Sequence, residues 1–215
     1  MLNLGSSLGG VSKVLFLGAH SDDIEIGCGG TVLKLLEMVP EVEVDWIVLS
    51  AGDERRREAE ASAKRFLTGA RSARIRIAGF RERYFPYLSE LKEYFDDLGR
   101  ELAPDLVFCP RHEDRHQDHR TVAELAANTF RNHMILHYEI PKYDADLGHP
   151  SVFVPLSEEV VDRKIAMLLE GFPSQQRRSW FTDLTFRSVL RIRGIESAAD
   201  EGFAEAFDCR KLMFF

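Results

Sequence analysis

Short apolar runs alternate with longer helix-forming stretches along the first two thirds of the chain. The apolar run at residues 14–17 predicts a buried strand, and residues 42–49, 106–109 and 134–140 predict further strands. Residues 74–78 predict one more, shorter strand. Helical composition, or a helical spacing of apolar residues, covers residues 31–36, 54–67, 87–102 and 121–130. The glycine-rich residues before the first of these helices predict a turn. Strands that alternate with helices are typical of a mostly parallel sheet covered on both faces, so we expect an α/β fold.

The last third of the chain has a weaker pattern. Residues 141–155 contain three prolines and Gly148, which predicts a long loop of the kind that often borders a binding pocket. Residues 157–170 predict a helix with Ser157 as its N-cap, and Ser188–Arg193 predicts a strand. We find no repeat and no linker, and expect a single domain over 1–215, with a core at about 13–140 and pocket elements over 141–215.

Composition and charge narrow the class of protein. Of the 215 residues, 45% are hydrophobic and 29% are charged, which indicates a globular chain rather than a disordered or fibrous one. The 35 acidic residues outnumber the 28 basic ones, and the net charge of −7 argues against non-specific nucleic-acid binding. No run approaches 18 apolar residues, so we expect no membrane span.

The cysteines and the first residues bear on the compartment. Cys28, Cys109 and Cys209 are too widely spaced for a disulfide framework or a CxxC metal motif. The first ten residues are small and rich in Gly and Ser, which predicts a loose lead-in without the pattern of a signal peptide. We therefore expect a reducing, cytoplasmic setting.

Two polar clusters carry the chemistry of the chain. The first, His20 to Glu25, and the second, His112 to His119, each follow an apolar strand and precede a helix. In an open sheet with the strand order 3-2-1-4-5, the first and fourth strands are neighbours at the point where the order reverses. Because sites form at the carboxyl ends of such strands, we expect the two clusters to face each other.

Histidine and carboxylate side chains at one crevice favour a divalent cation. His20 and Asp23 are three residues apart in a turn, and His116 and His119 share a helical spacing. Taken alone, the first cluster can simply cap a helix through Asp22 or Asp23, and the two later histidines can be solvated surface residues. A cation offsets the repulsion among the grouped carboxylates, and the joint arrangement favours a metal site.

These residues also resemble a known family. His20-Ser21-Asp22-Asp23-Ile24-Glu25, followed by Gly29-Gly30, is similar to the AHPDDE…GG motif of the PIG-L/LmbE-like metal-dependent N-deacetylases. The segment from His116 to His119 resembles the HxDH motif of the same family, and Arg57 with Glu60 resembles its RxxE helix. The resemblance covers about residues 13–140 and implies a Rossmann-like, three-layer fold. One departure is Ser21, which stands where proline is usual and affects the rigidity of the turn more than ligation.

The resemblance implies hydrolysis of the N-acetyl group of an amino sugar or its conjugate, including a nucleotide-linked one. It implies that His20, Asp23 and His119 bind one Zn²⁺, although Fe²⁺ accepts the same ligands. Such a cation polarises the carbonyl and lowers the pKa of water toward about 7.

The remaining roles carried over from the family concern proton transfer and charge. Asp22 would be the general base, because it can reach the attacking water from its position beside Asp23. His116 would stand near the developing oxyanion, and Asp118 would orient one of the histidines. On the residues alone, Asp22 and Asp23 can exchange their roles, and only the resemblance favours Asp22 as the base.

Three further side chains are candidates for contact with the substrate. The resemblance assigns such a contact to Arg57, whose guanidinium can hold a phosphate or a hydroxyl group. Asp53 either binds sugar hydroxyls or caps the helix that follows it, and Arg111 can meet an anionic substrate. The neighbouring Arg55 and Arg56 are expected on a solvated helix face.

Two other classes of protein compete with a deacetylase. A metal-dependent phosphoesterase also uses Asp and His, commonly with two metals. A Rossmann-like module that binds a nucleotide without catalysis is the non-enzyme alternative, and the intact polar set argues against it. The partner expected is a small molecule. Phe203, Phe207, Phe214 and Phe215 near the end of the chain form either a subunit contact in a homo-oligomer or core packing, which we favour.

Overall fold

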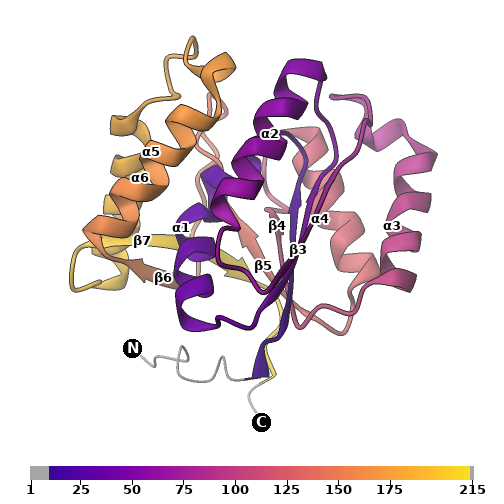
Figure 1. The fold of residues 1–215 in the computed structure, drawn as a ribbon. Coiled ribbons are helices and arrows are strands. Elements are labelled where there is room, and N and C mark those ends of the chain that lie inside the picture. Colours follow the sequence, from indigo (N-terminus) through magenta and orange to yellow (C-terminus); the bar gives the residue numbers. More distant parts are fainter. Residues whose placement is uncertain (1–9, 214–215) are drawn as a thin grey trace.

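The computed structural model describes residues 10–213 and contains one seven-stranded sheet with the order β3-β2-β1-β4-β5-β7-β6 (Figure 1). The strands are β1 (Lys13–Gly18), β2 (Glu43–Val48), β3 (Ser72–Ile77), β4 (Leu106–Pro110), β5 (Met134–Tyr138), β6 (Val152–Leu156) and β7 (Phe203–Cys209). The first five strands are parallel, whereas β7 is antiparallel to both β5 and β6. The predicted α/β fold with a mostly parallel sheet is confirmed, and the strand order reverses between β1 and β4 as expected.

Helices cover both faces of the sheet and make three layers. They are α1 (Asp23–Met38), α2 (Asp53–Phe66), α3 (Ser89–Glu101), α4 (Gln117–Thr129), α5 (Glu158–Gly171) and α6 (Asp183–Ser197). In Figure 1, α3 and α4 lie on one side of the sheet, and α1, α2, α5 and α6 lie on the other. Alternate residues of β1 explain this division: Phe16 packs into the core under α1, α2 and α5, and Leu17 packs into the core under α3 and α4.

The last third of the chain corrects two predictions. Ser188–Arg193 is not a strand, because it lies inside α6, where Phe186, Leu190 and Gly194 recur on one buried face at helical spacing. The predicted loop 141–155 ends early, since β6 begins at Val152. Pro155 fits there because β6 is an edge strand, where a missing N–H costs no ladder bond. The sequence pattern did not predict β7.

The glycine-rich segment is helical rather than a turn. The helix predicted from residue 31 begins at Asp23, and the glycines lie within it. At Gly27 a Cβ atom would fall 2.2 Å from the Tyr138 ring, so only glycine allows this approach of α1 to β5. The helix is interrupted at Cys28, whose φ of −146° is not helical.

Two of the four phenylalanines near the end of the chain, Phe203 and Phe207, lie within the described residues and pack against the core. Phe207 is fully buried, which confirms core packing for that ring, and Phe203 is half-buried against the same core. Phe214, Phe215 and the lead-in over residues 1–9 lie outside the described residues. From residue 10 to residue 213, none of the helices has both the length and the apolar character needed to cross a bilayer.

A buried histidine on β5 makes folding sensitive to acid. His137 is 2% exposed, and its Nδ1 lies 2.9 Å from the carbonyl oxygen of Pro110. Burial lowers the pKa of His137 to about 4, against about 6.5 in the unfolded chain. The unfolded state therefore binds more protons between these two values, and stability falls as the pH drops through that window.

Between pH 7 and pH 4.5, the unfolding free energy of the metal-free protein should fall by about 2 kcal/mol more than that of the His137→Gln variant. Urea unfolding of both proteins at the two pH values measures the difference. Equal losses in the two proteins would contradict a neutral, buried imidazole at this position.

Candidate metal and catalytic site

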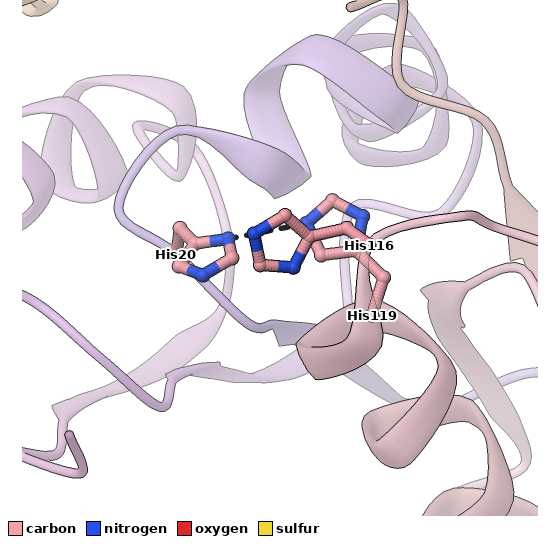
Figure 2. A group of neighbouring side chains, drawn as sticks. All are labelled: His20, His116 and His119. Carbon is pink, nitrogen blue, oxygen red and sulfur yellow. Dashed lines mark hydrogen bonds between the residues drawn. The ribbon is translucent and has the colours of Figure 1, made fainter. Parts of the chain in front are cut away.

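The two polar clusters meet at the carboxyl ends of β1 and β4. His20 follows β1, Asp23 is the first residue of α1, and His116 and His119 lie at the beginning of α4. Figure 2 shows the three histidine rings converging from these two segments. The strand order thus places the clusters face to face, 99 residues apart in sequence for His20 and His119.

Three donor atoms at this point form a compact triangle. His20 Nδ1 lies 3.1 Å from His119 Nε2, and Asp23 Oδ2 lies 3.3 Å from His119 Nε2 and 3.6 Å from His20 Nδ1. A tetrahedral zinc with bonds of about 2.1 Å separates its ligand atoms by roughly 3.4 Å. The three side chains are 7% exposed or less, and their spacing fits one divalent cation with an open position.

The three histidines also form a cluster that can bind a metal, with one nitrogen of each lying within 4.8 Å of the others. His116, however, is the N-cap of α4, and its Nδ1 accepts the backbone N–H of Asp118 at 3.3 Å. With the Nδ1 lone pair used, a neutral His116 carries its proton on Nε2 and presents a donor. Asp23 is therefore the better third ligand, and His116 is left to donate a hydrogen bond.

Carboxylates hold the outer nitrogen of both candidate ligand histidines. Asp118 Oδ2 lies 3.2 Å from His20 Nε2, the arrangement that its predicted orienting role requires. On the other side, Asp114 Oδ2 lies 2.9 Å from His119 Nδ1 and accepts a hydrogen bond from Lys142 Nζ. Each pair places the proton on the outer nitrogen and leaves the inner lone pair for a cation.

The sequence reasoning assigned no role to Asp114 or Lys142. Asp114 was visible as an acid five residues before His119 in the second cluster. Lys142 lies in the loop after β5 and carries no local signal. It reaches both Asp114 and Asp146, and so ties this loop to the site.

The electrostatics of the cluster favour positive charge. Burial alone would lower the pKa of both histidines, but Asp23 and the flanking carboxylates raise it to about 9 at His20 and about 10 at His119. Despite its burial, the pKa of Asp23 lies well below its usual range because the two histidines face it. A cation that binds here must displace protons, so its affinity falls as the pH is lowered.

Asp22 lies beside the triangle but takes a different partner. It is the N-cap residue of α1, yet its side chain makes no capping hydrogen bond; Oδ1 accepts from the Arg55 guanidinium at 2.6 Å. Burial raises the pKa of Asp22, and Arg55 opposes that rise. The first cluster thus does more than cap a helix, because Asp22 is paired with Arg55 next to the candidate ligands.

The arginines that begin α2 differ from expectation. Arg55 and Arg56 are not on a solvated face: Arg55 reaches Asp22, and Arg56 donates to the carbonyl oxygens of Ile77 and Ala78. Arg57 is exposed on the same helix. The RxxE pattern occurs twice in α2, as Arg55 with Glu58 and as Arg57 with Glu60. The first pair contacts other parts of the protein: Arg55 donates to Asp22, and the Glu58 carboxylate accepts from Ser174.

The other two candidate substrate residues lie at different depths. Asp53 is exposed as the first residue of α2, preceded by Gly52 as the N-cap. Arg111 is 7% exposed, and its guanidinium donates to the Asp146 carbonyl oxygen and lies 3.3 Å from Asp208. Substrate contacts for Arg57, Asp53 and Arg111 remain predictions, and Arg111 already has protein partners.

Comparison with known proteins identifies the family. The family model for PIG-L, described as GlcNAc-PI de-N-acetylase, matches residues 15–130. The chain belongs to the PIG-L family. This family member is 27% identical over 167 residues to the uncharacterized deacetylase YaiS of Escherichia coli (strain K12), covering 72% of this chain and 88% of that protein. It is 29% identical over 124 residues to a diacetylchitobiose deacetylase of Thermococcus kodakarensis, covering 51% and 46% respectively.

Solved structures share the fold of this PIG-L family member. The N,N'-diacetylchitobiose deacetylase of Pyrococcus horikoshii superposes with a TM-score of 0.74 at 22% identity, covering 97% of this chain and 87% of that one. The 4-carboxy-2-hydroxymuconate hydratase GalB of Pseudomonas putida KT2440 gives 0.73 at 18% identity, covering 95% and 98%. A hydratase and a deacetylase on one fold mean that the reaction must be argued from the site.

The contact between Arg55 and Asp22 gives a direct test of the site. We expect Arg55→Met to lower kcat/KM by about 10²-fold, because Asp22 loses its charged hydrogen-bond partner inside the site. Lys64→Met, on the exposed face of the same helix, is the matched control and should stay within about threefold of the parent. Steady-state kinetics with an N-acetyl amino sugar compare the two variants, and an Arg55→Met variant as active as the control would contradict the role of Arg55.

Proposed function

We propose that this PIG-L family member is a metal-dependent N-deacetylase of amino sugars or their conjugates. The observation that carries the proposal is the triangle of His20 Nδ1, Asp23 Oδ2 and His119 Nε2 with Asp22 beside it. The family description and the deacetylase names of the two relatives support the same reaction class. The diacetylchitobiose relative supports a small-molecule substrate that carries N-acetylglucosamine.

The proposed cofactor is one Zn²⁺ per chain, held by His20, Asp23 and His119. The donor set of two imidazoles and one carboxylate suits zinc, and Fe²⁺ accepts it as well. When bound, such a cation supplies Lewis acidity that polarises an amide carbonyl and lowers the pKa of water.

The residues around the triangle divide the proton transfers between them. Asp22 accepts a proton from the attacking water and later delivers it to the leaving amine. Arg55 fixes the Asp22 carboxylate by its 2.6 Å contact, so one oxygen stays oriented while the other is available. His116, with Nδ1 bound to the Asp118 amide, offers Nε2–H to the oxygen that becomes negative in the tetrahedral intermediate.

We further infer a single functional domain in a reducing compartment such as the cytoplasm. Cys28, Cys109 and Cys209 are all free thiols, which suits that setting. The loop after β5 is part of the proposed site through Lys142, which supports the expectation that residues 141–215 complete the pocket.

Purified protein should release acetate from at least one N-acetylglucosamine derivative in a panel of free, lipid-linked, thiol-linked and nucleotide-linked forms. Release should stop with a chelator and return with Zn²⁺. Asp22→Asn should lower kcat by about 10³-fold or more while the bound metal remains, because the amide cannot take up the proton.

The acetate-release assay, together with the metal content per chain and a phosphate-ester substrate, distinguishes the competing functions. Two metals per chain with hydrolysis of a phosphate ester would favour the phosphoesterase. Absence of both metal and acetate release would favour the nucleotide-binding module. Full activity of Asp22→Asn would remove Asp22 as the base while leaving the deacetylase intact.

A further inference from the structure

A buried ion pair interrupts the helix that carries the candidate ligand Asp23. Lys164 on α5 and Glu205 on β7 are 2–3% exposed, and Lys164 Nζ lies 2.6 Å from Glu205 Oε1. They meet α1 at the point where its backbone leaves helical geometry, at Cys28. Both α5 and β7 lie against α1 (Figure 1).

The pair occupies the place of a missing helical hydrogen bond. In a regular α-helix, the N–H of Gly30 would donate to the carbonyl oxygen of Ile26, four residues earlier. Here the Gly30 N–H donates to Glu205 Oε1 at 2.8 Å, and the Ile26 oxygen accepts from Lys164 Nζ at 2.8 Å. The ion pair thus lies between the donor and the acceptor of one helical hydrogen bond and makes a hydrogen bond with each of them.

A second amide follows the same pattern. Thr31 N–H, whose helical acceptor would be the carbonyl oxygen of Gly27, donates to Glu205 Oε2 at 2.6 Å. One carboxylate therefore caps the second segment of α1 with both of its oxygens, as an acid does at a helix N-terminus.

Stability gives no sufficient reason for this pair. Burying two charges costs desolvation, and well-packed apolar replacements of buried ion pairs are often neutral or stabilising. The pair does set a geometry, because it holds the short segment from Asp23 to Gly27 at an angle to the rest of α1. Gly27 packs on the Tyr138 ring, and the Tyr138 hydroxyl donates to Leu17 on β1, so the short segment is fixed against the strand that leads to His20.

We propose that Lys164 and Glu205 are positioning residues for the metal site. They hold the break in α1 open and thereby direct the Asp23 carboxylate toward His20 and His119. Both lie outside residues 15–130, so the last third of the chain supplies this constraint on the family's motif residues. The inference rests on the proposed function only in that it takes the triangle to be a cation site.

The test removes the inserted pair without leaving a lone buried charge. In Lys164→Met/Glu205→Leu, Gly30 N–H is free to bond Ile26 directly, and the short segment turns back onto the helix axis. We expect a 10–100-fold loss of Zn²⁺ affinity, measured by competition with a chromophoric chelator, and a similar loss of kcat with KM changed by less than about threefold.

A conservative variant distinguishes positioning from packing. In Lys164→Arg, the guanidinium can donate to both Glu205 and the Ile26 oxygen while Glu205 still accepts from the Gly30 and Thr31 amides, so Zn²⁺ affinity should stay within about fivefold of the parent. Leu98→Ala, buried on α3 across the sheet, is the stability control: it should lower Tm and leave Zn²⁺ affinity unchanged.

A readout on the metal-free protein completes the test. Hydrogen exchange at the Gly30 and Thr31 amides should differ between Lys164→Met/Glu205→Leu and Lys164→Arg, with Lys164→Arg matching the parent. Unchanged Zn²⁺ affinity in Lys164→Met/Glu205→Leu, or losses in all variants that simply follow Tm, would overturn the proposal. Failure of the parent itself to bind Zn²⁺ would instead refute the proposed function.

Discussion

The close approach of His20 Nδ1, Asp23 Oδ2 and His119 Nε2 is the constraint on which the site depends. Two imidazole nitrogens 3.1 Å apart cannot both present lone pairs to each other without a proton or a cation between them. The pKa values of both histidines are raised toward the basic range, which shows how strongly the surrounding carboxylates favour positive charge there. A divalent cation satisfies all three donors at once.

The surrounding structure serves to keep those atoms together. The reversal of strand order between β1 and β4 brings two distant segments to one point. Asp118 and Asp114 orient the two imidazole rings, Lys142 pairs with Asp114, and Arg55 pairs with Asp22. Asp23 depends on a helix that is broken at Cys28, where the buried Lys164–Glu205 pair takes over the helix's own hydrogen bonds. Local motif residues are thus held by contacts from the whole chain.

The sequence predicted the parts of the fold that local periodicity controls. The central strands β1 and β4 are buried on both faces and form continuous apolar runs, and the alternation of strands with helices predicted the mostly parallel sheet. The prediction failed where tertiary contacts decide. The glycine-rich segment suggests a turn until the Tyr138 ring is placed against Gly27. The branched apolar residues of Ser188–Arg193 suggest a strand, but they belong to a helix whose buried residues include Phe186 and Gly194.

Within the site, the sequence identified the acids and histidines of the two clusters but not their partners. Arg55 and Arg57 are both compatible with the same motif spacing, and only the direction of α2 distinguishes them. Lys142, Lys164 and Glu205 are distant in sequence from the residues they hold, so no local pattern could assign them.

X-ray absorption spectroscopy of the zinc-loaded protein tests the proposed ligand set directly. We expect one zinc with two imidazole ligands and oxygen ligands at about 2.0–2.2 Å, as His20, His119 and Asp23 would provide. Three imidazoles would place His116 in the ligand set and contradict its role as a hydrogen-bond donor. Zinc bound without any imidazole would contradict the site itself.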